Sequence, residues 1–327
     1  MFQFQKLIDI KDNAEKKKAY TRNDEKFALW FPVRVMEDAS VKDALDNLFE
    51  IYNQLLEENE YDILNGVLQC GDLQTIKKRC ESIKSVLTQY LSGDVIKAFK
   101  TFSKMMDNCI NDFPTKEVEN NTDFYRMRRE LGLTSKEEFY HLPTNMREKC
   151  ASERFSIAGY PCFYIGYSQN DCFAEISETG TMISLKLNNN VTINKILDLT
   201  YYKEQKVNAD LRKFLLAFPV IASCYVIMGN KKREENAKFR EEYIIPQMLT
   251  SYLKNKKEFD GICYYSVRLE YLNPIDDQKV NDYRNLVLFP NLEDDKQQDT
   301  DLMDKFEWKN IQLSIKKKIF VSKDIPN

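Results

Sequence analysis

The chain has 327 residues, of which 43% are hydrophobic and 12% aromatic, enough apolar material for two folded domains. Its formal net charge of −3 gives no reason to expect nucleic-acid binding. Residues 1–20 lack an apolar run, and no stretch is apolar for long enough to span a membrane. We therefore expect a cytoplasmic protein with no membrane-embedded part.

Cysteine and histidine usage argues against a metal site. The 8 cysteines are scattered without a CxxC pair, and there is 1 histidine. Structural zinc sites need clustered Cys and His ligands, so we expect no metal. Most of the cysteines have apolar neighbours, which predicts reduced thiols packed as small hydrophobic side chains.

The first third of the chain has the spacing of a helical bundle. Apolar residues recur at helical intervals within 41–56, 76–87 and 95–110, with Ser92-Gly93 marking a break. Several such helices form a small bundle. Residues 1–40 are polar and irregular, with Trp30-Phe31-Pro32-Val33 as a predicted docking point.

The second part of the chain mixes strands and helices. A polar stretch at 112–122 is the predicted linker, and we place the domain boundary between residues 117 and 118. Strands are predicted at 161–166, 181–187, 193–199, 261–266 and 285–289, helices at 209–227 and 236–256, and an added edge strand at 311–321. Their irregular alternation predicts an α+β fold, with a helical bundle over 1–117 and a mixed α/β domain over 118–327.

Several short segments of the second domain set one charged or hydroxylic residue among apolar ones. We expect each to place a polar group at the lip of a buried strand. They include Phe124–Arg128, His141–Pro143, Arg154–Ser156, Gly159–Gly166, Asp171–Glu175 and Asp260–Ser266. The set suits an anionic, sugar-bearing ligand such as a dinucleotide. Since the chain has no glycine-rich phosphate loop, arginine side chains would have to bind the phosphates.

In this order the segments resemble the RES-domain family, named for its Arg, Glu and Ser. The resemblance covers residues 122–290. It implies a fold related to ADP-ribosyltransferases and destruction of NAD by phosphorolysis or hydrolysis, with NAD as substrate. It also implies a toxin paired with an antitoxin protein. The run Ser152–Ser156 departs from the Gly-Gly-Arg-Trp-Asn of many shorter members, because the glycines are missing.

The resemblance assigns a role to each polar residue. Arg126 and Arg154 would hold the diphosphate, with Tyr125 beside the first of them, and Glu175 would stabilise an oxocarbenium-like transition state. Further substrate contacts would come from Tyr125, Tyr164, Ser266 and His141. Tyr164 would stack on the nicotinamide ring while its hydroxyl contacts the ribose.

Each of these residues also has a structural interpretation. Arg126 is also explained as part of a surface cluster with Arg128 and Arg129, and Arg154 as an ion-pair partner of Glu153 or Glu148. Core packing would explain Tyr164, and a buried salt bridge would explain Glu175. Purely structural roles would explain Ser266 and His141.

The helical first domain weakly resembles the HEPN-like domain that precedes RES in some long proteins. Catalytic HEPN domains cleave RNA with an Arg and a His a few residues apart, and this chain has no histidine before His141. We therefore expect a regulatory or dimerising bundle. A protein ADP-ribosyltransferase and a non-catalytic nucleotide- or partner-binding module remain alternatives to NAD degradation, and the acceptor is phosphate or water.

Overall fold

The computed structural model describes residues 32–36, 39–58, 67–176, 179–200, 208–228, 239–267, 283–292 and 297–314. The chain forms two compact units, a helical unit of residues 1–114 and 201–252 and a sheet unit of residues 115–200 and 253–327. The segment 201–252, which the sequence-based division placed in the second domain, belongs to the helical unit. The fold is α+β, with N-terminal helices, as predicted.

The helical unit is built on helices whose apolar faces are buried. It contains α2 (Val41–Glu58), α3 (Asp72–Leu91), α4 (Val95–Asp107), η2 (Ile110–Asp112), α7 (Asn208–Cys224), η5 (Glu241–Tyr243) and the start of α8 (Ile244–Lys256). A short parallel pair joins β1 (Val33–Val35) to β7 (Val226–Met228). Of the predicted docking segment, Trp30 and Phe31 lie outside the described residues.

Helices α3 and α4 are separated at the break that the sequence indicates. Gly93 has φ 89°, a left-handed conformation that glycine adopts without steric cost. The next residue, Asp94, is the N-cap of α4, where its side chain accepts a hydrogen bond from the Lys97 amide.

Pro219 lies inside α7 and leaves a main-chain acceptor without its usual helical donor. Proline has no N–H, so the Leu215 carbonyl cannot receive a bond from position 219. The Tyr52 hydroxyl of α2 donates to that carbonyl at 2.8 Å instead. The next carbonyl, of Leu216, accepts from the Arg79 guanidinium at 2.6 Å. The broken turn of α7 is therefore satisfied by side chains of α2 and α3.

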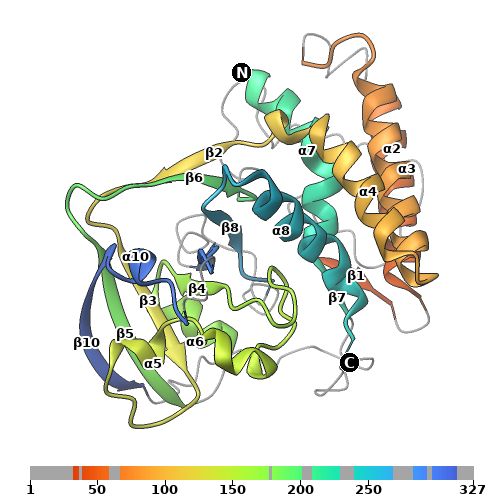
Figure 1. Cartoon of the computed structure of the whole chain (residues 1–327). Coiled ribbons are helices and arrows are strands. Elements are labelled where there is room, and N and C mark those ends of the chain that lie inside the picture. Colours follow the sequence, from red (N-terminus) through yellow and green to blue (C-terminus); the bar gives the residue numbers. More distant parts are fainter. Residues whose placement is uncertain are drawn as a thin grey trace, which may run out of the picture. The chain divides into compact units, whose positions relative to one another are not determined.

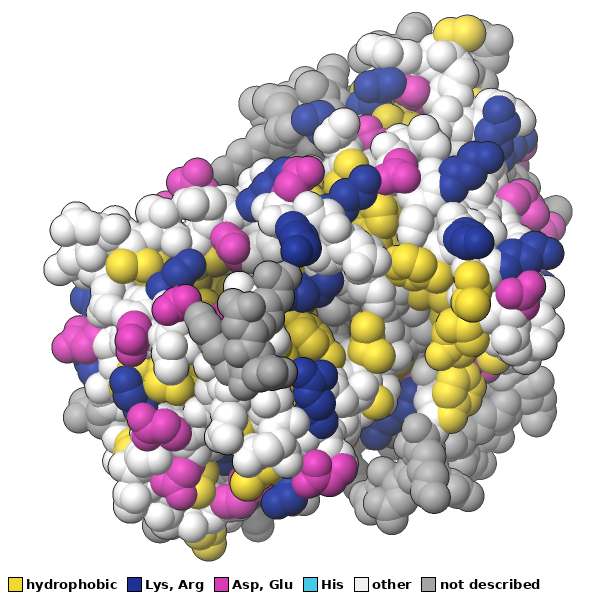
Figure 2. All heavy atoms as spheres, viewed as in Figure 1, with side chains coloured by type: hydrophobic (Ala, Val, Ile, Leu, Met, Phe, Trp, Pro, Cys, Tyr) yellow, Lys and Arg dark blue, Asp and Glu magenta, His cyan; other side chains and the backbone are white. Residues whose placement is uncertain are grey.

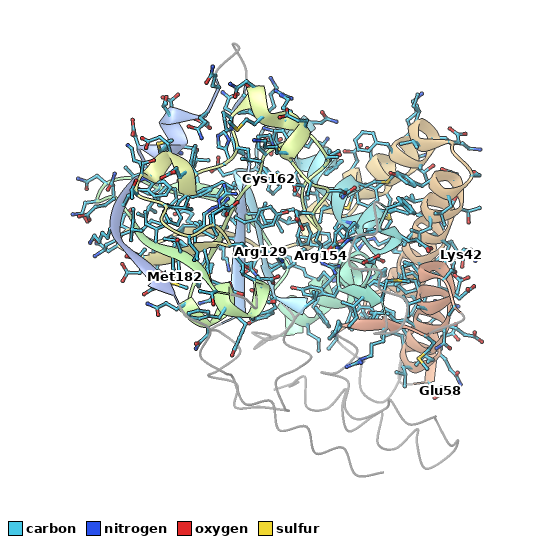
Figure 3. The ribbon with its side chains drawn as sticks, turned by 90° about the horizontal axis from the view of Figure 1, so that it is seen from below. Lys42, Glu58, Arg129, Arg154, Cys162 and Met182 are labelled. Atoms are coloured by element: carbon cyan, nitrogen blue, oxygen red, sulfur yellow. The ribbon has the colours of Figure 1, made fainter. Side chains whose placement is uncertain are left out.

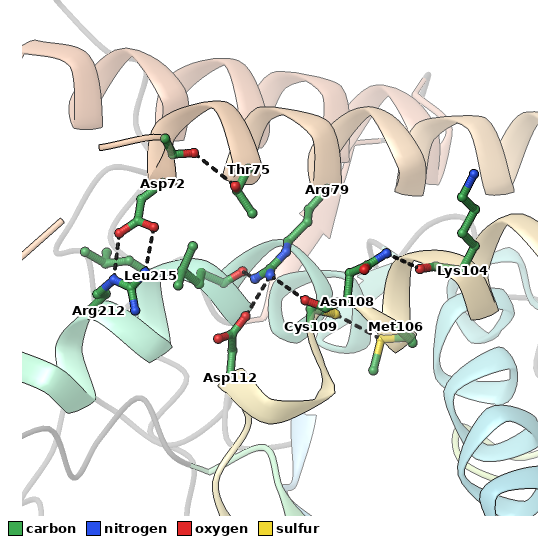
Figure 4. Close-up of polar contacts among 12 residues, drawn as sticks. Asp72, Thr75, Arg79, Lys104, Met106, Asn108, Cys109, Asp112, Arg212 and Leu215 are labelled. Atoms are coloured by element: carbon green, nitrogen blue, oxygen red, sulfur yellow. Dashed lines mark hydrogen bonds and ion pairs between the residues drawn. The ribbon is translucent and has the colours of Figure 1, made fainter. Parts of the chain in front are cut away.

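Two ion pairs attach α3 to the segments beside it (Figure 4). Asp72, at the start of α3, receives two hydrogen bonds from Arg212 of α7, at 2.7 and 2.8 Å. Arg79 is 6% exposed and also contacts Asp112 at 2.7 Å. Because breaking one partner of such a buried pair leaves an uncompensated charge, these contacts favour one packing of α7 over others.

The sheet unit holds an eight-stranded mixed sheet in the order β10-β5-β3-β4-β9-β8-β6-β2 (Figure 1). Its strands are β2 (Thr115–Val118), β3 (Asp123–Arg128), β4 (Phe163–Gly166), β5 (Gly180–Leu187), β6 (Ile193–Asp198), β8 (Gly261–Tyr265), β9 (Arg284–Leu288) and β10 (Phe306–Ser314). All neighbouring strands are antiparallel except β6 and β8. The shorter elements are α5 (Lys136–Phe139), η3 (Thr144–Lys149), α6 (Gln169–Ile176) and α10 (Thr300–Met303).

The two faces of the sheet are covered differently. On one face, here called the core face, Phe124, Phe163 and Leu286 belong to a large buried cluster that also includes residues of α5 and α10. On the other, the α6 face, Met127 and Met182 pack against Cys172 of α6. Successive residues of a strand point to opposite faces, so β3 contributes to both.

Some elements differ from those predicted. The stretch predicted as a linker contains strand β2, whose Val118 is buried against the core. The predicted helix at 209–227 ends at Cys224, after which the chain forms β7. The predicted C-terminal edge strand starts earlier, at Phe306, and its part beyond Ser314 lies outside the described residues.

On the face drawn in Figure 2, basic and acidic side chains are interspersed over the described surface. Within the described part of the chain, none of the helices combines the length and the apolar character needed to cross a bilayer.

We predict that Tyr52→Phe lowers the free energy of unfolding by about 1–3 kcal/mol, because it leaves the buried Leu215 carbonyl without a donor. In a Pro219→Ala background the cost of the same change shrinks, since an alanine at that position supplies the missing N–H. Urea unfolding of the four proteins in this cycle measures both costs. Equal costs in the two backgrounds would contradict this account of α7.

Candidate functional site

A row of residues crosses the α6 face of the sheet at one level. Tyr125 of β3 pairs with Gly166 of β4, which pairs with Asn285 of β9, which pairs with Tyr264 of β8. Paired residues on neighbouring strands point to the same face, so their side chains form a line on which α6 lies.

Gly166 lets α6 approach the sheet closely. A Cβ at this position would lie 2.6 Å from Oδ2 of Asp171 and 3.3 Å from its Cβ. The 2.6 Å contact is far below van der Waals distance, so a side chain at 166 would force the Asp171 carboxyl to shift. The position of that carboxyl therefore depends on the missing side chain at 166.

Glu175 follows Asp171 by one helical turn and meets two strands. Its Oε1 accepts a hydrogen bond from the Ser266 hydroxyl at 2.6 Å and one from the Asn285 amide at 3.2 Å. Ser266, predicted as the last residue of a strand over 261–266, directly follows β8. Glutamate and serine, 91 positions apart in the chain, are thus in direct contact.

Asp171 is fully buried and shares the same amide. The Asn285 Nδ2 group donates to Asp171 Oδ1 at 3.1 Å, and the other oxygen, Oδ2, has no hydrogen-bond partner among the described residues. Burial and then the nearby charge of Glu175 raise the pKa of Asp171 well above its ordinary value. The raised pKa favours the protonated form of Asp171, beside a Glu175 that accepts two hydrogen bonds.

The loop before β4 brings Arg154 to the same face. Arg154 (labelled in Figure 3) is 5% exposed, and the ring of its neighbour Phe155 lies 4.6 Å from that of Tyr264. Burial raises the pKa of Tyr264, Glu175 and Tyr164 raise it further, and the charge of Arg154 lowers it. The charges of Arg154 and Glu175 therefore both act on the Tyr264 hydroxyl.

Tyr164 supports this loop. Its hydroxyl accepts from the Phe155 amide at 3.2 Å and donates to Ser156 Oγ at 3.3 Å. Burial raises the pKa of Tyr164 well above its ordinary value. The hydroxyl that was predicted to contact a ribose is thus engaged in positioning the residues next to Arg154.

Arg126 occupies the gap where β3 and β4 separate. The two strands pair only at Tyr125 and Gly166, and beyond that point the Arg126 guanidinium donates to the Tyr164 carbonyl of β4. Its carbon Cζ lies 5.0 Å from the Phe163 ring centre. Burial, and then Arg128, lower the pKa of Arg126. As predicted, Arg126 shares the face of Phe124, and Met127 points to the other.

His141 lies on the core side of the sheet, and not on the α6 face with Asp171 and Glu175. Its Nδ1 donates to the Leu142 carbonyl at 2.8 Å and its Nε2 accepts from the Asp299 amide at 3.0 Å. These partners assign the proton to Nδ1. Burial lowers the pKa of His141 to about 4, so the imidazole is neutral at physiological pH.

The structure thus unites part of the predicted set. Glu175 and Ser266 are bonded directly, and Tyr125 lies in the row beneath α6. Glu175 comes from a helix, however, and not from the lip of a strand. Asp171, Asn285 and Tyr264 were missed. The helical spacing of Asp171 and Glu175 was a visible signal, whereas Asn285 carried none.

Carboxylate, amide, hydroxyl and guanidinium groups make up this site. Among the described residues no group of His, Cys, Asp and Glu side chains is arranged to hold a metal ion. A carboxylate held by two donors is suited to stabilising a cationic centre electrostatically.

Comparison with known proteins gives one informative similarity. The chain is 26% identical over 256 residues to the Bacillus subtilis (strain 168) protein named "Putative toxin YopC". The similarity covers 69% of this chain and 57% of the relative, so the chain matches less than two thirds of that protein's length. No protein-family model matches, and no solved structure does. The chain is therefore a distant relative of a protein named as a toxin.

We expect Gly166→Ala to lower the free energy of unfolding by about 1–3 kcal/mol, because the new methyl group meets the Asp171 carboxyl. Asp171→Ala removes the opposing group and should suppress most of that cost in the double variant. Thermal unfolding of the single and double variants tests the contact. A double variant as unstable as the sum of the two singles would show that the two positions do not press on each other.

His141 gives a second prediction, on pH. Its folded pKa of about 4 is below the ordinary value of 6.5, so the stability it contributes is full above pH 6.5 and is lost as the pH falls toward 4. This shift corresponds to roughly 3 kcal/mol.

The control is His141→Gln, whose amide can still accept from the Asp299 N–H but does not titrate. We expect this variant to lose less stability between pH 6.5 and pH 4 than the unmodified chain does. Since the chain has 1 histidine, no second imidazole obscures the difference. Parallel stability-versus-pH curves for the two proteins would refute it.

Proposed function

We propose that the chain is a toxin-like effector that consumes NAD by cleaving its nicotinamide N-glycosidic bond. The observation that carries the proposal is the contact of Ser266 and Asn285 with one oxygen of Glu175. The Glu and Ser of the RES resemblance, distant in sequence, meet at one place. The similarity to a protein named as a toxin supports the coarser part of the proposal.

The proposed chemistry follows from the carboxylate. When the glycosidic bond breaks, nicotinamide leaves with the bonding electrons and the ribose gains oxocarbenium character. A carboxylate facing that carbon stabilises the developing positive charge. Two donors on Oε1 hold Glu175 in place, so little reorganisation is needed at the moment of reaction. Phosphate or water then forms the new bond at the same carbon.

The other residues receive supporting roles. Arg154, on the α6 face with Glu175, would bind the diphosphate, because guanidinium groups match phosphate oxygens in a planar fork. Arg126, whose side chain shares the core face of Phe124, would reach the same ligand only through the gap between β3 and β4. Ser266 would act first on Glu175, through its 2.6 Å hydrogen bond. Tyr164 would act on the Arg154 loop through Phe155 and Ser156. His141 would help to shape the fold beside Arg126, because both of its ring nitrogens are engaged.

The proposal includes a partner. A toxin that depletes NAD in its own cell needs restraint, and an antitoxin protein would supply it. Self-association of the chain into a homo-oligomer would be another form of restraint.

The direct test incubates the purified full chain with NAD, with and without inorganic phosphate, and resolves the products by mass. Nicotinamide with a phosphorylated ADP-ribose identifies a phosphorylase, and free ADP-ribose identifies a glycohydrolase. Glu175→Gln keeps the shape of the side chain and removes its charge. We expect it to lower the rate of NAD loss about 10²–10³-fold, corresponding to roughly 3–4 kcal/mol.

Glu117→Gln is the matched control. Glu117 lies exposed on β2, so the same change there should leave the rate unaltered. Full activity of Glu175→Gln would contradict the catalytic role proposed for Glu175. Absence of NAD loss in the unmodified chain, with NAD binding retained, would favour a nucleotide-binding module instead.

A further inference from the structure

Strand β3 carries two partly buried arginines on the same face. Arg126 and Arg128 are two positions apart, so their side chains point the same way and their Cα atoms are about 7 Å apart. Each donates to one main-chain carbonyl, Arg126 to that of Tyr164 and Arg128 to that of Tyr140 at 2.7 Å. In each, the Nε atom is buried without a hydrogen-bond partner among the described residues.

Neither guanidinium has a carboxylate partner in the described part of the chain. The acidic residue whose charge acts on Arg128 is Glu130, which is exposed and forms no ion pair with it. His141, which the two arginines also influence, is neutral. Burial lowers the pKa of both arginines, and Arg128 lowers that of Arg126 further. Two cations thus lie close together, and no described carboxylate forms an ion pair with either of them.

An exposed arginine, or a buried arginine beside an acidic residue, does not carry this uncompensated cost of burying a charge. Arg129, the next residue, is exposed, as arginines usually are. As whole residues, both Arg126 and Arg128 keep part of their surface open to solvent. Guanidinium groups that hold only carbonyl oxygens retain donors for further acceptors.

We propose that Arg126 and Arg128 together form a binding site for an oxyanion of the phosphate type. The ligand would supply both the missing negative charge and acceptors for the remaining N–H groups. A phosphate or diphosphate group has the charge and the oxygen atoms to bridge two guanidiniums. Arg128 is thereby a ligand-binding residue, and not part of a surface cluster with Arg129.

Two sources of such a group are compatible with this site. It is either the diphosphate of a dinucleotide or free inorganic phosphate acting as acceptor. The choice between them rests on the proposed function, whereas the oxyanion site itself does not. Binding can therefore be measured without turnover.

The experiment titrates the full chain with inorganic phosphate and, separately, with ADP-ribose at constant ionic strength, followed by calorimetry. Arg128→Met keeps an unbranched apolar stem and removes the donors. Loss of charge-assisted hydrogen bonds should weaken binding of at least one probe roughly 10–100-fold. Arg129→Met is the matched control one residue away and should bind both probes like the unmodified chain.

Each result decides the proposal. Weakening confined to Arg128→Met supports it. Unchanged binding in Arg128→Met, equal weakening in Arg129→Met, or no binding of either probe to the unmodified chain overturns it. If Arg128→Met does not fold, Arg128→Lys replaces it. Lysine keeps one charge but loses the planar fork, so weaker binding supports the proposal and unchanged binding overturns it.

The two probes separate the sources. Weakening of ADP-ribose alone assigns the site to the diphosphate, and weakening of inorganic phosphate alone assigns it to the acceptor. The oxyanion site and the proposed function can fail separately. Oxyanion binding that depends on Arg128, without NAD loss, would support the site and contradict the function. NAD loss with binding that does not depend on Arg128 would support the function and contradict the site.

Discussion

The close approach of α6 to the sheet at Gly166 positions the rest of the candidate site. Because position 166 has no side chain, the Asp171 carboxyl packs directly on β4. The next helical turn then places Glu175 where Ser266 of the β8 end and Asn285 of β9 reach the same oxygen. Three separate elements, namely α6, the end of β8 and β9, thus meet at the Glu175 carboxylate, one turn after the carboxyl that packs on Gly166. The two acids also differ in their surroundings. Asp171 is fully buried, whereas Glu175 accepts hydrogen bonds from two donors.

The sequence allowed more of the fold than of the site to be predicted. Helices with a clear apolar face, such as α2 and α3, and strands of apolar residues, such as β5 and β8, match their patterns. Strand β2 was hidden because Lys116 and Glu117 look like loop residues, and only pairing with β6 reveals Val118 as buried. Asn285 resembles any polar residue in a strand, since its partners lie more than a hundred positions away. Contacts of this kind depend on tertiary packing and leave no local pattern.

Electrostatics divides the sheet unit into two chemically different regions. On the α6 face, carboxyl groups face amide and hydroxyl donors, and Arg154 is near Tyr264. At and beside the β3–β4 gap, the Arg126 and Arg128 guanidinium groups donate to main-chain carbonyl oxygens, and Arg126 also lies over the Phe163 ring. Under the proposed function, a dinucleotide cleaved at its glycosidic bond would bring negative phosphates and a carbon that becomes positive during the reaction. The α6-face region, with Glu175 and Arg154, is the one that would meet both parts of such a ligand.

The position of the single histidine narrows the chemistry further. A nucleophilic serine needs a base to accept its proton, and imidazole is the usual one. Both nitrogens of His141 are occupied, by the Leu142 carbonyl and the Asp299 amide, and the ring lies among core-face residues. The Ser266 hydroxyl donates to Glu175 instead. A hydrolase of the Ser-His type therefore has no support in this chain. The hydroxyl instead orients a carboxylate, and that carboxylate is the group through which the site would act on a substrate.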